Sequence, residues 1–173
     1  VGEKEITVVH AGYTTSFTVN VFENLSGICG ESLTWTLNYD GTLTISGAGA
    51  MTEYASDSEI PWSSEKTNIK TLILSDELTT ISAYAFNGCT NLTGTITIPK
   101  SVTSIGNNAF TDCSNIIEVV FESEIVPTFG TNVFSSTMTA LETIYVPVAA
   151  YDSYVGALSG MVSDTAEFVA VEE

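Results

Sequence analysis

The sequence ISAYAFNGCTNL at residues 81–92 returns as IGNNAFTDCSNI at residues 105–116, a step of 24 residues. Phe86 of the first copy corresponds to Phe110, and the same step leads to Phe134 in a third, more divergent copy. A fixed period in the twenties is typical of a solenoid, in which each unit covers the apolar face of its neighbour. We therefore expect these three phenylalanines to form one continuous column inside the molecule.

Each copy also contains a short apolar run that predicts a strand. The runs are Leu72-Ile73-Leu74, Ile96-Thr97-Ile98, Val119-Val120-Phe121 and, as a fourth, Ile144-Tyr145-Val146. Alternate side chains of a strand point to opposite faces, so we expect the first and third residues of each run to point into the core. After each strand we expect a turn, and then a short helical turn at the Ala-Phe pair.

The opposite, solvent-facing side of these strands has a functional interpretation. It would form a concave face with two sets of residues: Ile73, Thr97, Val120 and Tyr145, flanked by Thr71, Thr95, Glu118 and Thr143. Solenoids commonly hold a partner on such a face. The alternative is that β-branched and aromatic residues occur here because they favour strands.

Segments outside the repeats predict further elements. Residues 6–9 and 16–21 predict a hairpin around a turn with Gly12, and a linker from Phe22 to Gly27 follows. A second hairpin has alternating Leu33, Trp35 and Leu37 on one arm and Leu43 and Ile45 on the other; with Met51, Tyr54 and Trp62 it would cap the first coil. Residues 148–158 predict a short amphipathic helix and residues 167–171 a closing strand, which together would cap the last coil. The expected division is therefore 1–23, a β-hairpin; 24–68, an N-terminal β cap; 69–147, the repeats; and 148–173, a C-terminal cap.

The charge balance excludes two classes of partner. Twenty-one acidic residues face four lysines and no arginine, which gives a net charge of −17. Binding to nucleic acid or to anionic lipid depends on Lys and Arg, so we expect neither nucleic-acid binding nor membrane insertion. No apolar run is long enough to span a membrane.

Candidate chemistry is sparse. His10 is the single histidine and lies in a predicted hairpin turn, without a serine or cysteine in a nucleophile-like context. The paired glycines at 47 and 49 lack the remainder of a phosphate loop and indicate a tight bend. Glu122 and Glu124 lack the spacing of a calcium loop, and the three cysteines lack zinc spacing. We expect no catalytic residue, no metal site and no cofactor.

Two of the cysteines, Cys89 and Cys113, occupy the same repeat position. Adjacent coils would bring them about one strand spacing (~5 Å) apart, which would also admit a disulfide. Cysteine behaves well as a small buried apolar residue, so we expect free thiols.

The repeat units resemble BspA-like leucine-rich repeats, on the motifs ISAYAFNGCTNL and IPKSVTSIGNNAFTDCSNI, whose pattern is an Ile-Pro strand end, a Val-Thr-Ser-Ile step, Ala-Phe, Cys and Leu. The stretch CGESLTWTLNYDGTLTISGAGAM is similar to the segment often found before these repeats. The stretch ITVVHAGYTTSFTVNV at residues 6–21 resembles the last two strands of a bacterial immunoglobulin-like domain. The resemblance implies a secreted or surface-anchored bacterial protein that adheres or binds ligands without catalysis.

Together these observations predict an α/β solenoid: a short, right-handed leucine-rich-repeat coil with parallel strands, short helical turns, a β-hairpin N-terminal cap and a small C-terminal cap. The expected function is a noncatalytic, acidic cell-surface or secreted module for protein-protein interaction or adhesion through the concave face, acting as a monomer. The first alternative is a glycan-binding module with exposed Tyr or Trp rings. The second is a structural spacer that presents other domains.

Overall fold

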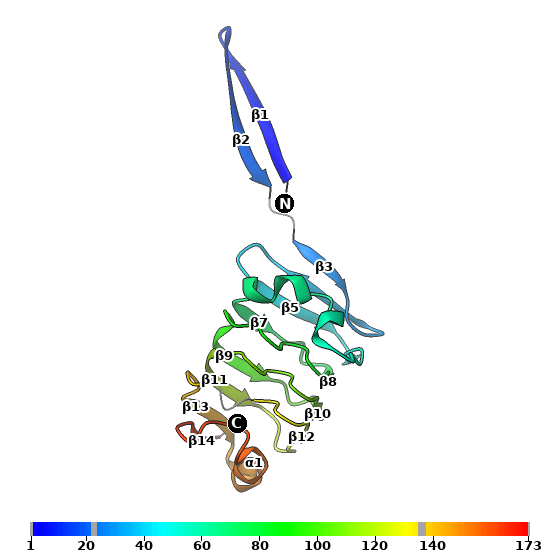
Figure 1. The fold of residues 1–173 in the computed structure, drawn as a ribbon, viewed down its shortest axis with the longest axis vertical. Coiled ribbons are helices and arrows are strands. Elements are labelled where there is room, and N and C mark those ends of the chain that lie inside the picture. Colours follow the sequence, from blue (N-terminus) through cyan, green and yellow to red (C-terminus); the bar gives the residue numbers. More distant parts are fainter. Residues whose placement is uncertain (1, 22–23, 135–137, 173) are drawn as a thin grey trace.

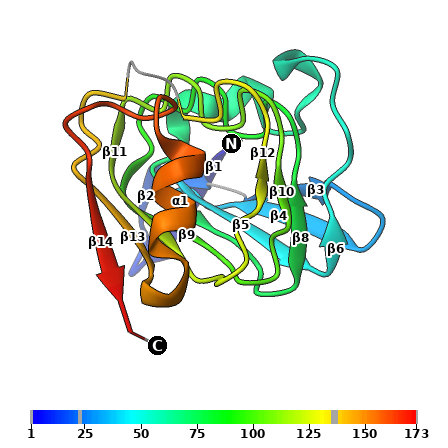
Figure 2. The same cartoon turned by 90° about the horizontal axis from the view of Figure 1, so that it is seen from below.

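Two parallel ladders run through the repeats, because each repeat contributes two strands. The computed structural model describes residues 2–21, 24–134 and 138–172. The first ladder contains, in spatial order, β9 (Thr93–Ile98), β11 (Asn115–Phe121), β13 (Thr143–Pro147) and β14 (Glu167–Val171). The second contains β6 (Gly49–Ala50), β8 (Leu78–Ile81), β10 (Ser104–Ile105) and β12 (Thr128–Phe129). Figures 1 and 2 show the ladders on opposite sides of the stack of repeats.

The predicted phenylalanine column is confirmed. The ring centroids of Phe86 and Phe110 lie 5.1 Å apart, and those of Phe110 and Phe134 lie 5.4 Å apart, in both cases stacked. Trp62 extends the column, since its ring stacks on Phe86 at 5.9 Å and its Nε1 donates a hydrogen bond to Ala85 O. All four rings are 2% exposed or less. The repeats therefore share one continuous core.

The predicted short helical turns at the Ala-Phe pairs are wrong. Residues 83–88 and 107–112 form hydrogen-bonded turns instead of helices. Tyr84 and Gly88 have φ angles of +61° and +74°, and Asn108 and Asp112 have φ angles of +56° and +61°. Left-handed residues on both sides of the Ala-Phe pair interrupt the run of right-handed dihedral angles that a helix needs.

Hydrogen bonds between repeats replace the hydrogen bonds that a helix would have made. The backbone N–H of Phe86 donates to Ala109 O at 2.8 Å, and that of Phe110 donates to Val133 O at 3.0 Å. The turns are thus connected in the same way as the strands, so each repeat is held by its neighbour on several sides.

Antiparallel strands precede the first repeat. The order is β3 (Leu25–Ile28), β4 (Leu33–Leu37), β5 (Thr42–Gly47) and then β7 (Thr71–Ile73), which pairs parallel with β5. The predicted hairpin of β4 and β5 is confirmed, and the predicted fillers Trp35, Met51, Tyr54 and Trp62 are buried. The predicted linker at 22–27 is wrong in part, because β3 begins at Leu25. Two short 3-10 helices, Asp57–Glu59 and Ser63–Asn68, lead back to the repeats.

The last repeat is followed by a helix and a strand, as predicted. A 3-10 turn at Val148–Ala150 continues into α1 (Tyr151–Leu158), and β14 then pairs parallel with β13. The ring of Tyr154 lies 4.9 Å from that of Phe121, and its hydroxyl donates to Ser123 O at 2.7 Å. These two contacts hold helix α1 against the end of β11.

The N-terminal hairpin is also present. Strands β1 (Gly2–His10) and β2 (Tyr13–Val21) pair antiparallel along their whole length. Ala11 and Gly12 join them with φ angles of +49° and +82°, the positive pair that a two-residue hairpin loop favours. The hairpin projects away from the repeats (Figure 1). Its immunoglobulin-like origin stays a prediction.

We expect Phe110→Ala to lower the free energy of unfolding by about 3–5 kcal/mol, because it leaves a cavity between two stacked rings. Chemical denaturation followed by circular dichroism measures this change. Ile125→Ala is the control, since Ile125 is 79% exposed and its substitution should cost less than about 0.5 kcal/mol. Equal effects of the two substitutions would show that the column does not support the fold.

Candidate functional site

Strand register brings six of the eight predicted face residues together in one ladder. Glu118 of β11 lies opposite Thr95 on one side and Thr143 on the other. Val120 lies likewise between Thr97 and Tyr145. These two rows face away from the core, whose inward residues on the same strands are Ile96, Val119 and Ile144.

The remaining two predicted residues, Thr71 and Ile73, lie on the neighbouring strand β7. That strand pairs with β5 and not with β9, although the Thr93 N–H donates to Lys70 O where the two strands begin. Ile73 is 50% exposed. The face therefore continues across two sheets with a break in the ladder between β7 and β9.

Glu118 joins three strands of this face. Its carboxylate accepts a hydrogen bond from Thr95 Oγ1 at 2.6 Å and a longer one, at 3.4 Å, from the hydroxyl of Tyr145. The half-buried tyrosine is therefore tied at its tip to the middle of the face. A carboxylate held in this way positions its neighbours and gives the face a fixed negative charge.

The sequence reasoning missed part of the face at both ends. Thr42 and Thr44 of β5 lie opposite Thr71 and Ile73, so they extend the same two rows. At the other end Glu167 and Val169 of β14 lie opposite Thr143 and Tyr145. The alternation of threonine with Leu43 and Ile45 in residues 42–45 was a usable signal, because it places both threonines on the side opposite the core. We call the solvent side of β5, β7, β9, β11, β13 and β14 the outer sheet face.

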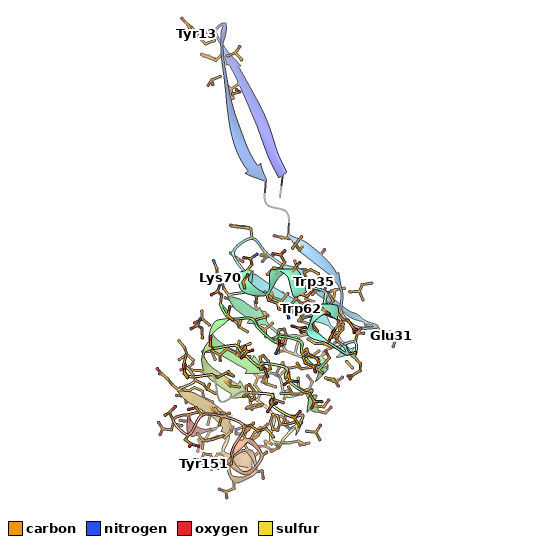
Figure 3. All side chains as sticks on the ribbon, in the orientation of Figure 1. Tyr13, Glu31, Trp35, Trp62, Lys70 and Tyr151 are labelled. Atoms are coloured by element: carbon orange, nitrogen blue, oxygen red, sulfur yellow. The ribbon has the colours of Figure 1, made fainter. Side chains whose placement is uncertain are left out.

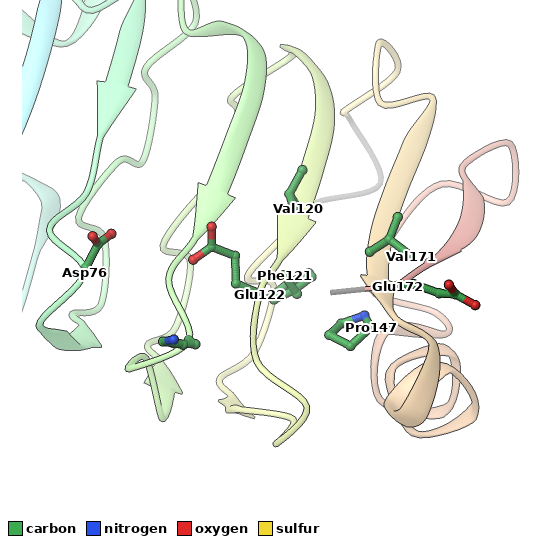
Figure 4. Close-up of a pocket in the computed structure, with 8 residues that line it drawn as sticks. Asp76, Val120, Phe121, Glu122, Pro147, Val171 and Glu172 are labelled. Atoms are coloured by element: carbon green, nitrogen blue, oxygen red, sulfur yellow. The ribbon is translucent and has the colours of Figure 1, made fainter.

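A groove runs along one edge of this face, where the strands end. It has a volume of about 420 Å³ and is lined by Asp76, Lys100, Val120, Phe121, Glu122, Pro147, Val171 and Glu172. Figure 4 shows its labelled residues at or just beyond the ends of successive strands. Val120 belongs to both the groove and the outer sheet face. The sequence analysis considered Glu122 only as a calcium ligand. A usable signal was that Asp76 and Lys100 lie one 24-residue period apart and both follow a strand.

Cys89 and Cys113 are free and buried, as predicted, and so is Cys29. Burial raises the pKa of Cys29 to about 11 and that of Cys89 to about 12, and it also raises the pKa of Cys113. Cys113 Sγ donates to Phe86 O at 3.0 Å. These groups stay protonated near neutral pH and are not nucleophiles.

The described residues contain no cluster of three or more His, Cys, Asp or Glu side chains suited to a metal ion. His10 lies exposed at the tip of the N-terminal hairpin, opposite Tyr13. Within the same described residues no helix has both the length and the hydrophobicity needed to cross a bilayer.

Comparison with known proteins identifies the repeat. The family model described as BspA type leucine rich repeat region (6 copies) matches residues 63–160, and no curated protein matches the chain. Among solved structures, a leucine-rich repeat protein from Eubacterium ventriosum has a TM-score of 0.53 at 22% identity, over 75% of this chain and 46% of its own. A leucine rich cell surface protein from Faecalibacterium prausnitzii has a TM-score of 0.36 at 18% identity, over 76% of this chain and 45% of its own. The chain spans less than half the length of either protein.

We expect the three thiols to be unreactive toward Ellman's reagent (DTNB) at pH 8 while the chain is folded, because they are buried and protonated. In denaturant all three should react. The raised pKa values of the thiols also affect stability. Below the ordinary thiol pKa of about 9 the thiols are protonated in both the folded and the unfolded chain, so they leave the free energy of unfolding unchanged. Above that pH the thiols of the unfolded chain lose their protons first, so the free energy of unfolding falls as the pH rises. Rapid labelling of the folded chain would contradict the buried arrangement.

Proposed function

Because the chain belongs to the family of BspA-type leucine-rich repeat proteins, we propose that it is a noncatalytic protein-interaction or adhesion module, secreted or on the bacterial cell surface. The observation that carries the proposal is the outer sheet face, on which strand register aligns two rows of solvent-facing side chains, across β5 and β7 and, beyond the break in the ladder, across β9, β11, β13 and β14. An extended face of this kind suits another protein better than a small molecule, which needs an enclosing pocket.

The composition of the outer sheet face supports a protein partner. Exposed Ile73 and Ile117 supply apolar contact area among threonines, whose hydroxyls donate and accept hydrogen bonds. Threonine and isoleucine on strands have few rotamers, so little side-chain entropy is lost when a partner orders them. The eight predicted residues from Thr71 to Tyr145 are our candidate contact residues, and we propose that this face is the concave one.

Glycan recognition is the less favoured alternative. Aromatic rings must be exposed to stack on a sugar, but Trp35 is 7% exposed and Trp62 is fully buried. Tyr145 is half-buried, and its hydroxyl is engaged by Glu118. The well-exposed rings of Tyr13 and Tyr39 lie outside the outer sheet face. A structural spacer remains the third candidate.

We further propose the division of the chain on which this function depends. Residues 69–147 would form a right-handed repeat coil between a β cap at 24–68 and a smaller cap at 148–173, with the hairpin of 1–23 as a separate immunoglobulin-like segment. The stacking of Trp62 on Phe86 and the packing of Tyr154 on Phe121 support the two caps. Figure 3 shows Trp35 and Trp62 at one end of the repeats and Tyr151 at the other. The proposed module acts as a monomer.

The test is a binding screen of the purified chain against arrays of extracellular proteins and of glycans. For each protein captured, Ile73→Glu should weaken binding about tenfold or more, since a charge would be buried without a partner. Ile125→Glu is the matched control, because Ile125 is more exposed and lies outside the outer sheet face. Equal binding of the two variants would reject this face, and hits confined to the glycan array would favour the alternative.

A further inference from the structure

The groove at the strand ends is chemically different from the outer sheet face beside it. Its floor and walls are apolar where Val120, Phe121, Pro147 and Val171 meet, between the ends of β11, β13 and β14. Its rim carries three carboxylates, from Asp76, Glu122 and Glu172, and one ammonium group, from Lys100. A ligand for this groove must therefore combine an apolar part with a charged one.

The carboxylates of the rim are not neutralised by contact with a cation. Among the side chains that the structure describes, the one ion pair joins Lys66 to Asp57 at 2.8 Å, and neither residue lines the groove. The groove thus has more negative than positive charge, on a chain whose net charge is −17. Such a field attracts cations and repels anionic ligands.

The spacing of the carboxylates favours an elongated ligand over a metal ion. Neighbouring strands of one ladder lie about 4.8 Å apart, and β11 and β14 are two strands apart, so Glu122 and Glu172 are separated by about 10 Å of backbone. Asp76 follows β7, on the other side of Glu122 and beyond β9. The described residues contain no carboxylate cluster that would hold a metal.

The floor of the groove also argues against a sugar. Phe121, the one aromatic residue among the lining residues, is 1% exposed, so its ring face is not available for stacking. Val120 and Val171 are half-buried and offer aliphatic surface instead. A long aliphatic stem with a cationic head matches both parts, and that is the structure of a lysine or arginine side chain.

We propose that this groove receives lysine or arginine side chains from an extended basic segment of the partner protein. The aliphatic stem packs against Val120, Pro147 and Val171, and the cationic head lies toward Glu122. The inference rests on the proposed function, since Val120 joins the groove to the outer sheet face. It adds the chemical class of the partner segment.

The probe is a fluorescein-labelled peptide, Gly-Lys-Val-Lys-Val-Lys-Gly, whose binding to the full chain is measured by fluorescence anisotropy. Two peptides in which glutamate or glutamine replaces every lysine serve as comparisons. We expect the lysine peptide to bind at about 20 mM NaCl and to bind much more weakly at about 500 mM, where exposed charges are screened. The glutamate and glutamine peptides should not bind.

Two pairs of variants locate the site. Glu122→Gln should weaken binding of the lysine peptide about two- to fivefold, the size of a partly exposed ion pair. Glu31→Gln makes the same change in net charge on an exposed residue between β3 and β4, in the sheet that precedes the repeats (Figure 3), and it should leave binding unchanged. Lys100→Met should strengthen binding because it removes a like charge from the rim, whereas Lys70→Met should not.

Three results would overturn the inference: no binding at low salt, equal binding of the glutamine peptide, or equal effects of Glu122→Gln and Glu31→Gln. The Ile73→Glu variant separates this inference from the proposed function, because Ile73 does not line the groove. Loss of protein capture in Ile73→Glu without any binding of the lysine peptide would remove the groove proposal alone. Binding of the peptide with unchanged protein capture by Ile73→Glu would remove the outer sheet face alone.

Discussion

The hydrogen bonds that join each repeat to the next are the constraint on which the rest of the structure depends. They occur in both ladders and also in the turns, where Phe86 N–H donates to Ala109 O. The turns approach so closely that a Cβ on Gly106 would collide with the backbone of Ala83, and one on Gly130 with the backbone of Asn107. Because each hydrogen bond needs its partner at a fixed position, neighbouring turns stay in register and the phenylalanines stack. The strands tolerate small differences in repeat length, since the step is 23 residues from Ile96 to Val119 and 25 residues from Val119 to Ile144.

The same strand register divides the residues of each strand into inward positions, which pack in the core, and outward positions, which face solvent. Inward positions keep similar apolar residues, as in Leu72, Ile96, Val119 and Ile144. The outward neighbours on these strands, Ile73, Thr97, Val120 and Tyr145, differ in size and polarity without disturbing the stack. The outward residues of a repeat can therefore differ from those of its neighbours while the inward residues keep the packing of the core.

Much of the fold was readable from the sequence because the period and the strand alternation are both strong signals. The phenylalanine column, the hairpin of β4 and β5, helix α1 and strand β14 follow from them. The second ladder was missed because strands of two to four residues, such as Ser104–Ile105, are too short to show alternation. The helical turns were predicted wrongly because positive φ angles at Tyr84 and Asn108 leave no mark in composition. The groove was missed because its lining residues come from five different strand ends.

The charge distribution gives the groove and the outer sheet face a common property. No basic residue occurs after Lys100, so the later repeats and the C-terminal segment carry carboxylates alone. Carboxylates that repel one another destabilise a compact chain, and here the hydrogen-bonded stack must hold them together. A partner that brings cations to Glu122 and Glu172 relieves that repulsion as it binds, whereas a neutral partner leaves it in place. The acidity from which we expect no binding to nucleic acid or anionic lipid is therefore also the basis of the proposal that the groove receives a basic segment.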